Sequence, residues 1–349
     1  MVVFENINCL QQRIDVSLPW ITICYTSLLI DASKTSRHKL SHICLKTVYF
    51  FSKQFAFNMV FPQVVAAFHA LFDAMGLPGN LLVILTIVLE RRFHMMRYIL
   101  LASLAVSDFL FLILVNSFRI SSVAQERWTH GETMCYLNAF FARYFYLNTV
   151  LHLVAVSYER YKAIVKSPLV YDGALTTSRA VFVVLIWVVP IPLSFGPFLG
   201  FAGEYVYNPE VFHCEQGWSN QTGSSGLNTA FFAIFSFVVP FLVIVFLNWL
   251  VFKTAKVQIN SLEVQVGSVG GSEIQQQEMS RRMKERRAAV DVSIIIAAFL
   301  LCFLPVWITG ICRQFVKSMK VPAEVVLAAA CIFFSSSLCN PIIYCIRTK

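Results

Sequence analysis

Charged residues are scarce in this sequence. Only 13% of its 349 residues are charged, whereas soluble domains carry about 25%. Hydrophobic residues make up 57% of the chain, and its mean hydropathy is +0.67. This deficit predicts that much of the chain is surrounded by lipid rather than by water.

The sequence motifs of catalysis and of metal binding are also missing. There is no phosphate-binding loop, no Ser/His/Asp array and no Cys/His spacing typical of zinc. We therefore expect no enzymatic activity. The ten cysteines lie mostly inside apolar runs, where a free cysteine behaves as a small hydrophobic residue.

What the chain does have is a series of long apolar runs. A helix needs about 20 mostly apolar residues to cross a bilayer, and non-helical backbone cannot face lipid. The runs that meet this length are residues 62–89, 98–124, 134–158, 178–201, 228–252, 288–312 and 323–346. We predict an all-α membrane protein, a seven-transmembrane helix bundle that occupies residues 62–349.

Residues 1–61 differ from the rest of the chain. They contain two short apolar pieces but no basic start typical of a secretory signal. We expect an extracellular segment that is poorly ordered, or a start-site extension that precedes Met59. An eighth crossing by residues 18–30 would be short for a bilayer span.

The basic residues predict the orientation in the membrane. The gaps after spans one, three and five, with their edges, carry Arg91, Arg92, Arg97, Lys162, Lys166, Arg179, Lys253, Lys256, Arg281, Arg282, Lys284, Arg286 and Arg287. The other gaps have fewer basic residues, so the positive-inside rule places the N-terminus outside the cell and the C-terminus inside. The net charge of +9 is then mostly a cytoplasmic feature, and no nucleic-acid partner is needed to explain it.

Three further residues fall on the predicted outer face. Asn220 begins the glycosylation sequon Asn220-Gln221-Thr222. Cys135 lies at the outer end of span three, and Cys214 lies in the long gap after span four. These two cysteines form a disulfide across the outer end of the helix bundle, or they are two free thiols.

A few polar residues lie inside the predicted spans, where their insertion into lipid is unfavourable and usually marks function. Asn80, Asp108 and Asn340 are in spans one, two and seven. Thr149 and Ser336 would add oxygens beside them. Such a cluster would hold a sodium ion, our only candidate cofactor, or a network of water molecules.

Several motifs occur together in a fixed order. They are "GN" at 79–80, "SLAVSD" at 103–108, "WTHGETMC" at 128–135, "SYERY" at 157–161, Trp187, Cys214, Pro240, "CFLP" at 302–305 and "NPIIY" at 340–344. This set resembles the rhodopsin-like (class A) G-protein-coupled receptors over residues 62–349.

The resemblance implies a multi-pass plasma-membrane receptor that binds an extracellular ligand and activates heterotrimeric G proteins. It implies that Cys135 and Cys214 are bridged. It also implies that Glu159 holds Arg160 at rest and that Glu285 clamps Arg160 to helix six, which opens on activation. The other switch positions that it implies are Tyr161, Asn340, Pro341 and Tyr344.

The chain departs from the family pattern at several positions. Phe303 stands where tryptophan is usual, Asn248 where tyrosine is common, and Ser336 where asparagine is common. No eighth helix follows Tyr344, so the tail is absent or the sequence is a fragment. These departures leave open a receptor-like protein that binds ligand without G-protein signalling. A transporter is also open, although Asp108 stands nearly alone and no repeat relates the two halves.

The ligand class is constrained mainly by two positions. Amine receptors of this family carry an aspartate where this chain has Ala142, and opsins carry a retinal-binding lysine where it has Phe334. A ligand amine paired with an aspartate of helix three is therefore disfavoured. A light-sensing function is also disfavoured.

Two arginines in the outer halves of their helices remain, Arg143 and Arg119. Each would bind a ligand carboxylate or phosphate, or would instead extend to the interface or pair with an acid such as Asp73. Aromatic side chains expected to line a ligand pocket, or simply to pack between helices, are Tyr146, Phe303, Trp307 and Phe334.

Overall fold

The computed structural model describes residues 62–166, 174–199, 204–217, 234–268, 296, 300–310, 312 and 321–337, with the backbone alone over 258–268. Several predictions fall outside these residues. They concern the segment 1–61, Asn220, Glu285, Asn340, Pro341 and Tyr344.

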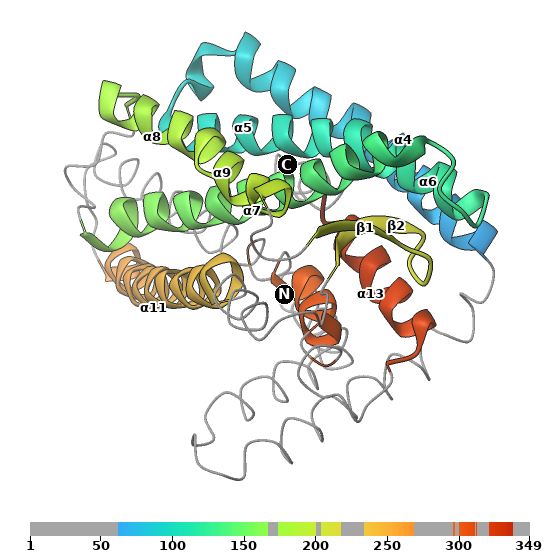
Figure 1. The fold of residues 1–349 in the computed structure, drawn as a ribbon. Helices are drawn as coiled ribbons and strands as arrows, with labels where there is room; N and C mark the ends of the chain where they lie inside the picture. Colours follow the sequence, from blue (N-terminus) through green and yellow to red (C-terminus); the bar gives the residue numbers. More distant parts are fainter. Residues whose placement is uncertain are drawn as a thin grey trace.

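The described chain is almost entirely helical (Figure 1). In chain order, its elements are α4 (Pro62–Leu89), η2 (Arg91–Phe93), α5 (Met96–Phe111), η3 (Leu112–Asn116), α6 (Ser117–Ala124), α7 (Gly131–Tyr161), η4 (Lys162–Lys166), α8 (Thr177–Val188), α9 (Pro190–Phe195), η5 (Gly196–Leu199), β1 (Glu204–Asn208), β2 (His213–Gly217), η6 (Ile234–Val238), α11 (Val239–Ser268) and α13 (Ala323–Phe334).

Five continuous helical segments are long and apolar enough to cross a membrane. They are Pro62–Leu89, Met96–Ala124, Gly131–Lys166, Thr177–Leu199 and Ile234–Val257. The shorter apolar helices Leu300–Gly310 and Ala323–Phe334 lie within the sixth and seventh predicted spans. The structure therefore has a helix in each of the seven predicted spans.

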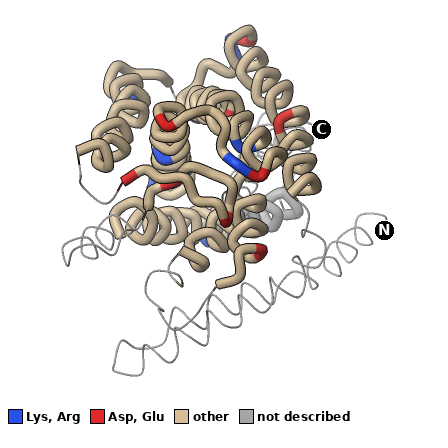
Figure 2. The backbone as a smooth tube through the Cα atoms, turned by 45° about the vertical axis from the view of Figure 1, so that its right-hand side comes forward, with Lys and Arg blue, Asp and Glu red and all other residues tan. Residues whose placement is uncertain are grey.

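The outer surface of these helices is apolar. Leu82, Val88 and Phe246 are 58%, 61% and 58% exposed, and few of the described residues are charged (Figure 2). Soluble proteins rarely expose contiguous apolar surface on this scale, because it would associate or aggregate in water. Lipid contact explains the exposed side chains.

Helix α7 is the central element. It packs against α5, α9, α11 and both strands, and it is more buried than the other long spans. It begins at Gly131, whose φ of +78° is in the region that favours glycine. Residues that α7 carries therefore reach both the outer and the inner end of the bundle.

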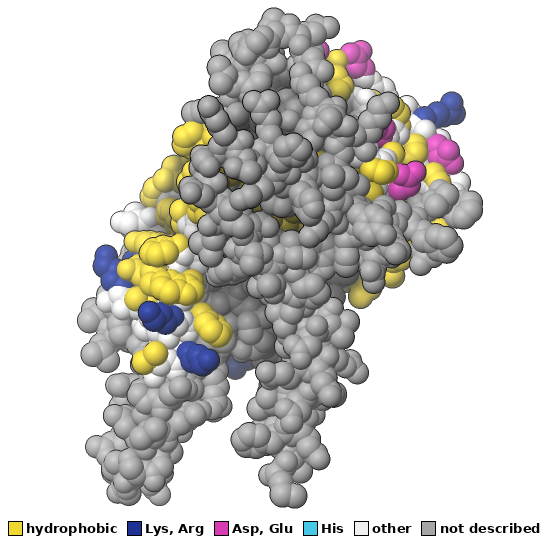
Figure 3. Space-filling model, turned by 90° about the horizontal axis from the view of Figure 1, so that it is seen from below, with side chains coloured by type: hydrophobic (Ala, Val, Ile, Leu, Met, Phe, Trp, Pro, Cys, Tyr) yellow, Lys and Arg dark blue, Asp and Glu magenta, His cyan; other side chains and the backbone are white. Residues whose placement is uncertain are grey.

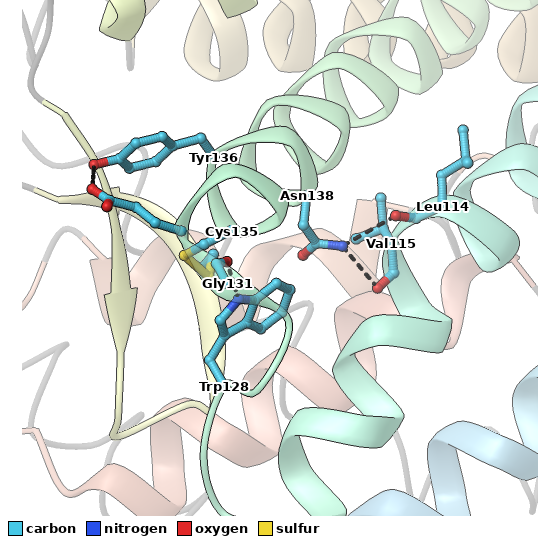
Figure 4. The surroundings of a disulfide bond; sticks show 9 residues. Leu114, Val115, Trp128, Gly131, Cys135, Tyr136 and Asn138 are labelled. Atoms are coloured by element: carbon cyan, nitrogen blue, oxygen red, sulfur yellow. Dashed lines mark hydrogen bonds between the residues drawn. A yellow bond between two sulfur atoms is a disulfide. The ribbon is translucent and has the colours of Figure 1, made fainter.

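A π-helical segment, η3, interrupts the second span between α5 and α6. A π turn widens the helix and weakens its regular bonding, so its carbonyl groups accept other donors. Asn138 of α7 donates to the carbonyls of Leu114 and Val115 at 3.1 and 3.3 Å (Figure 4). The π segment thereby joins the second span to α7.

A β-hairpin follows the fourth span, and the sequence analysis did not predict it. Strands β1 and β2 are antiparallel, with Tyr207 opposite Cys214. Cys214 forms a disulfide with Cys135 at the start of α7 (Figure 4), which confirms the bridge and excludes two free thiols. The disulfide fixes the hairpin to the end of the central helix.

Helix α11 is longer than predicted. The fifth span was expected to end near residue 252. The helix continues instead to Ser268. The prediction was wrong at this boundary because it followed hydrophobicity, and a helix does not end where its side chains become polar.

Candidate functional site

A cavity of about 890 Å³ lies between the hairpin and the helices. Its wall combines α6, α7, the hairpin, the helix at 300–310 and α13. The site residues predicted from the sequence that line it are Arg119, Ala142, Tyr146, Trp307 and Phe334. Polar residues from the hairpin and from helix six, His213, Glu215, Gln216 and Thr309, complete the lining.

Arg119 is the most unusual residue of the cavity wall. It is only 1% exposed, so it does not extend to the membrane interface. Its Nε donates to Nε2 of His69 at 3.2 Å, and its guanidinium lies 4.4 Å from the centre of the Phe334 ring. Its Nη2 has no hydrogen-bond partner among the described residues.

Phe334 organises the groups around this arginine. Its ring meets His69 edge-on at 5.1 Å and His213 edge-on at 5.9 Å. His69 comes from α4 and His213 from β2. Three distant parts of the chain thus meet at one aromatic ring beside the cavity.

Aromatic residues form another part of the cavity wall. The Tyr146 ring lies 5.8 Å from that of Trp307, and Trp307 stacks on Phe237 at 4.4 Å. Phe303 contacts Tyr146 and Phe333 at 5.7 and 5.0 Å, but it is absent from the cavity lining. Phe303 therefore supports the wall from behind.

Arg143 does not line the cavity. Its Nη1 donates to Oε1 of Gln216 in β2. The alternative partner, Asp73, instead accepts a hydrogen bond from Asn116 at 2.6 Å, so the suggested Arg143–Asp73 pair is not formed. Neighbouring helix positions point about 100° apart, and here Ala142, not Arg143, faces the cavity.

Burial shifts the pKa of titratable groups in the hairpin. Tyr205 donates to the carbonyl of Ser194 at 2.7 Å, and burial raises its pKa to about 12. Burial, with the nearby Arg119 and His69, lowers the pKa of His213 well below its usual value. His213 is therefore neutral at physiological pH.

The predicted sodium cluster is only partly described. Asp108, Thr149 and Ser336 are all buried, and Asn80 donates to the carbonyl of Ser337 at 3.1 Å. A carboxylate with hydroxyl oxygens suits a hard cation. Sodium binding at this place stays a prediction.

A polar network that was not predicted from the sequence connects spans two, three and four. Ser103 Oγ accepts a hydrogen bond from Trp187 Nε1 at 2.9 Å and lies 2.8 Å from His152 Nε2. Asn148 donates to the carbonyl of Ile186 at 3.2 Å. Ser103, Asn148 and His152 are polar residues inside apolar runs, and this pattern could have predicted the network from the sequence.

The third and fifth spans meet at a polar contact near the C-terminal end of α7. Glu159 is 6% exposed, and Tyr161 packs beside Val251 and Ala255. Asn248 Nδ2 donates to Ser157 Oγ at 2.8 Å. Asn248, which replaces the usual tyrosine, thus links α11 to α7 two residues before Glu159.

The sequence of the hairpin also contains a pattern that could have predicted it. In "EYVYNPEVFHCEQG", β-branched and aromatic residues flank an Asn-Pro turn. Some cavity residues were not predicted from the sequence. His213 and Gln216 are in this segment, and Thr309 lies in the same helix as the predicted site residues Phe303 and Trp307.

The chain is similar to known proteins in sequence and in structure. A sequence model described as "7 transmembrane receptor (rhodopsin family)" matches residues 79–344. The 5-hydroxytryptamine receptor 4 of Rattus norvegicus is 26% identical over 321 residues, which cover 84% of this chain and 75% of the relative. Trace amine-associated receptor 8b of the same species is 28% identical over 305 residues, covering 86% and 85%.

A solved structure agrees with these matches. Squid rhodopsin superposes with a TM-score of 0.70 over 81% of each chain, at 18% sequence identity, which is a likeness of fold alone. The family match spans most of the chain and includes the motifs around Asn80, Asp108 and Arg160. The chain therefore belongs to the rhodopsin family of seven-transmembrane receptors.

Proposed function

We propose that this receptor binds a small extracellular ligand in the cavity beside the hairpin and activates a heterotrimeric G protein at its inner end. The observation that carries the proposal is the cavity itself, about 890 Å³, which lies between helices of a receptor fold and a disulfide-fixed hairpin. Concave, largely apolar sites with a few polar groups are typical of small-ligand binding.

The distribution of charge supports an orientation with the hairpin outside the cell. Figure 3 shows Lys and Arg side chains at one end of the molecule and mostly Asp and Glu at the other. The hairpin carries Glu204, Glu210 and Glu215, whereas the far part of α11 carries Lys253 and Lys256. By the positive-inside rule, the basic end faces the cytoplasm. We place the receptor in the plasma membrane with its N-terminus extracellular.

The ligand of this receptor differs from an amine anchored on helix three. The relatives are named for 5-hydroxytryptamine and trace amines. In this chain Ala142 faces the cavity at the place where the family's amine receptors carry an aspartate. An alanine offers no charge to an ammonium group, so recognition in this cavity depends on other residues.

Signalling would use the inner ends of the helices. Arg160, held by Glu159 and by Glu285 of helix six, would be released when helix six moves outward. An ion pair between two helices is a two-state element that ligand binding can bias. The buried position of Glu159 and the link from Asn248 to Ser157 support tight packing of these helix ends at rest.

The proposal is tested by basal signalling in cells that display the receptor. Glu159→Gln and Glu285→Ala should raise basal G-protein signalling, and Arg160→Ala should abolish it. Glu90→Gln is the matched control, because Glu90 is an exposed acid that pairs only with the neighbouring Arg92 at 3.6 Å. Equal signalling by all variants at equal surface expression would favour a protein that binds without signalling.

A further inference from the structure

We infer that the ligand of this cavity carries a carboxylate group and that Arg119 binds it. This inference rests on the proposed function, because it names the ligand chemistry of the same cavity. It depends on the surroundings of Arg119, on the second donor supplied by the hairpin, and on the aromatic character of the remaining wall.

Arg119 is a buried cation with an unused donor. Its side chain is 1% exposed and lines the cavity, and its Nη2 has no hydrogen-bond partner among the described residues. Its Nε bonds to Nε2 of His69, which must accept this hydrogen bond with a lone pair. That histidine is therefore neutral and adds no charge to the site.

No described carboxylate is within salt-bridge distance of Arg119; the described ion pair is Arg92 with Glu90. Glu215 lines the same cavity, but its Oε1 accepts a hydrogen bond from Asn208 at 2.6 Å. Glu215 attracts Arg119 electrostatically but forms no direct ion pair with it, and a buried charge without a direct ion pair is unfavourable. The contact with the Phe334 ring at 4.4 Å offsets this only in part, since cation–π attraction is weaker than an ion pair.

His213 supplies a second unpartnered polar atom beside the same ring. It is 7% exposed and lines the cavity, and its Nδ1 also has no partner among the described residues. Arg119 lies over the face of Phe334, and His213 meets the ring edge-on at 5.9 Å. A ligand group that accepts hydrogen bonds from both would satisfy two buried polar atoms at once.

A carboxylate fits this arrangement better than a phosphate. Arg119 contributes a single positive charge, while His69 accepts a hydrogen bond as a neutral imidazole. A carboxylate carries one negative charge and matches the planar guanidinium. A phosphate group, with nearly two negative charges, would leave an uncompensated charge inside the protein.

The rest of the ligand should be apolar and flat. Tyr146, Trp307 and Phe333 also line the cavity, and the ring centres of Tyr146 and Trp307 are 5.8 Å apart. Aromatic faces stack on other flat groups. We therefore assign aryl monocarboxylates as the ligand class.

The test measures binding without a G protein. Purified full-length receptor in lipid nanodiscs is heated with phenylacetate, indole-3-acetate or naphthoate, and its thermal midpoint is recorded over a range of probe concentrations. Each acid is paired with its primary amide and with the amine of similar skeleton, such as tryptamine. Inorganic phosphate is tested in the same way, to show whether the site binds another kind of anion.

We expect at least one acid to raise the midpoint and its amide and amine to have no effect. Arg119→Gln should weaken acid binding about 10- to 100-fold, as expected for the loss of a charged hydrogen bond, and Arg119→Lys should retain part of it. Arg127→Gln, at an exposed arginine just outside the span, is the matched control. His213→Phe should weaken binding while leaving the folded hairpin, which separates ligand contact from misfolding.

The inference is overturned if no acid binds, if amides or amines bind as well as acids, if phosphate alone binds, or if folded Arg119→Lys and Arg119→Gln bind like the wild type. Acid binding without any G-protein activation would contradict the proposed function and leave this inference standing. Receptor activation by an amine, without any need for Arg119, would contradict this inference and leave the proposed function standing.

Discussion

Several polar side chains inside the spans bond to one another or to helix carbonyls. Ser103 connects Trp187 and His152, and Asn138 bonds to two carbonyls of a π segment. Measured hydrogen bonds between membrane helices contribute about 0.6 kcal/mol on average. A residue that serves two partners should therefore matter more than most.

Ser103→Ala removes the oxygen that the buried ring of His152 and the half-buried ring of Trp187 share. We expect the free energy of unfolding to fall by about 1–2 kcal/mol, because both partners lose a hydrogen bond in an apolar region. The measurement is the thermal midpoint of the purified protein in nanodiscs. Ser117→Ala is the control, since this exposed hydroxyl bonds only to the carbonyl of Ile113 in its own span. Equal midpoints for both variants would show that the network contributes nothing.

His213 should make the stability of the protein depend on pH. Its pKa is lowered in the folded state, mainly by burial and then by Arg119 and His69, whereas an unfolded histidine titrates near 6.5. Its contribution to stability is thus complete above pH 6.5 and is lost as the pH falls below that value. At pH 5 the folded protein should therefore be less stable than at pH 7.5.

The measurement compares thermal midpoints at pH 7.5 and pH 5 for the wild type and for His213→Gln. The variant should lose part of the pH dependence, and His94→Gln, at an exposed histidine near the inner end, should keep all of it. An unchanged pH dependence in His213→Gln would refute a neutral buried imidazole.

At the scale of elements, α7 and the hairpin form one unit. The Cys135–Cys214 disulfide closes a loop of 79 residues that includes the fourth span. Tyr205 of β1 bonds to the end of α9 through Ser194. The hairpin is thus attached at both the third and the fourth span, and its β2 strand supplies His213 to the cavity.

Removing the disulfide with Cys135→Ala and Cys214→Ala together should lower stability by about 2–5 kcal/mol, because the unfolded chain gains freedom when a long loop opens. The thermal midpoint should fall and should respond less to reductant than that of the wild type, in which Cys135–Cys214 is a second reducible bond beside the disulfide of Cys312. Cys302→Ala, at a cysteine outside any disulfide, should leave the response intact. If the thermal midpoint of the wild type were the same with and without reductant, a structural disulfide would be contradicted.

The elements were predictable where hydrophobicity alone defines them. The first span was predicted at 62–89, and α4 is Pro62–Leu89. The end of α11 was not predictable in this way, because its last turns are polar. The short hairpin lacks the long apolar run on which the prediction of spans depended.

The candidate site was predictable in composition but not in geometry. Arg119 and Arg143 both qualified as cations near the outer end, and no sequence pattern states which one faces a cavity. The structure separates them, since Arg119 lines the cavity and Arg143 bonds to Gln216. That choice depends on the hairpin, whose position arises from a long-range disulfide.

For the whole molecule, the charge distribution and the family membership point to signalling across a membrane. Lys and Arg side chains lie at one end of the molecule and mostly Asp and Glu at the other (Figure 3). The central helix α7 carries Cys135 at one end and Arg160 near the other. One rigid element therefore connects the cavity to the proposed G-protein surface.

The most direct measurement is guanine-nucleotide exchange on purified heterotrimeric G proteins by the receptor in nanodiscs. We expect the wild type to accelerate exchange above the receptor-free rate, Glu285→Ala to accelerate it further, and Arg160→Ala to return it to the receptor-free rate. Exchange that stays at the receptor-free rate with every G protein tried, for the wild type and for Glu285→Ala alike, would contradict the account.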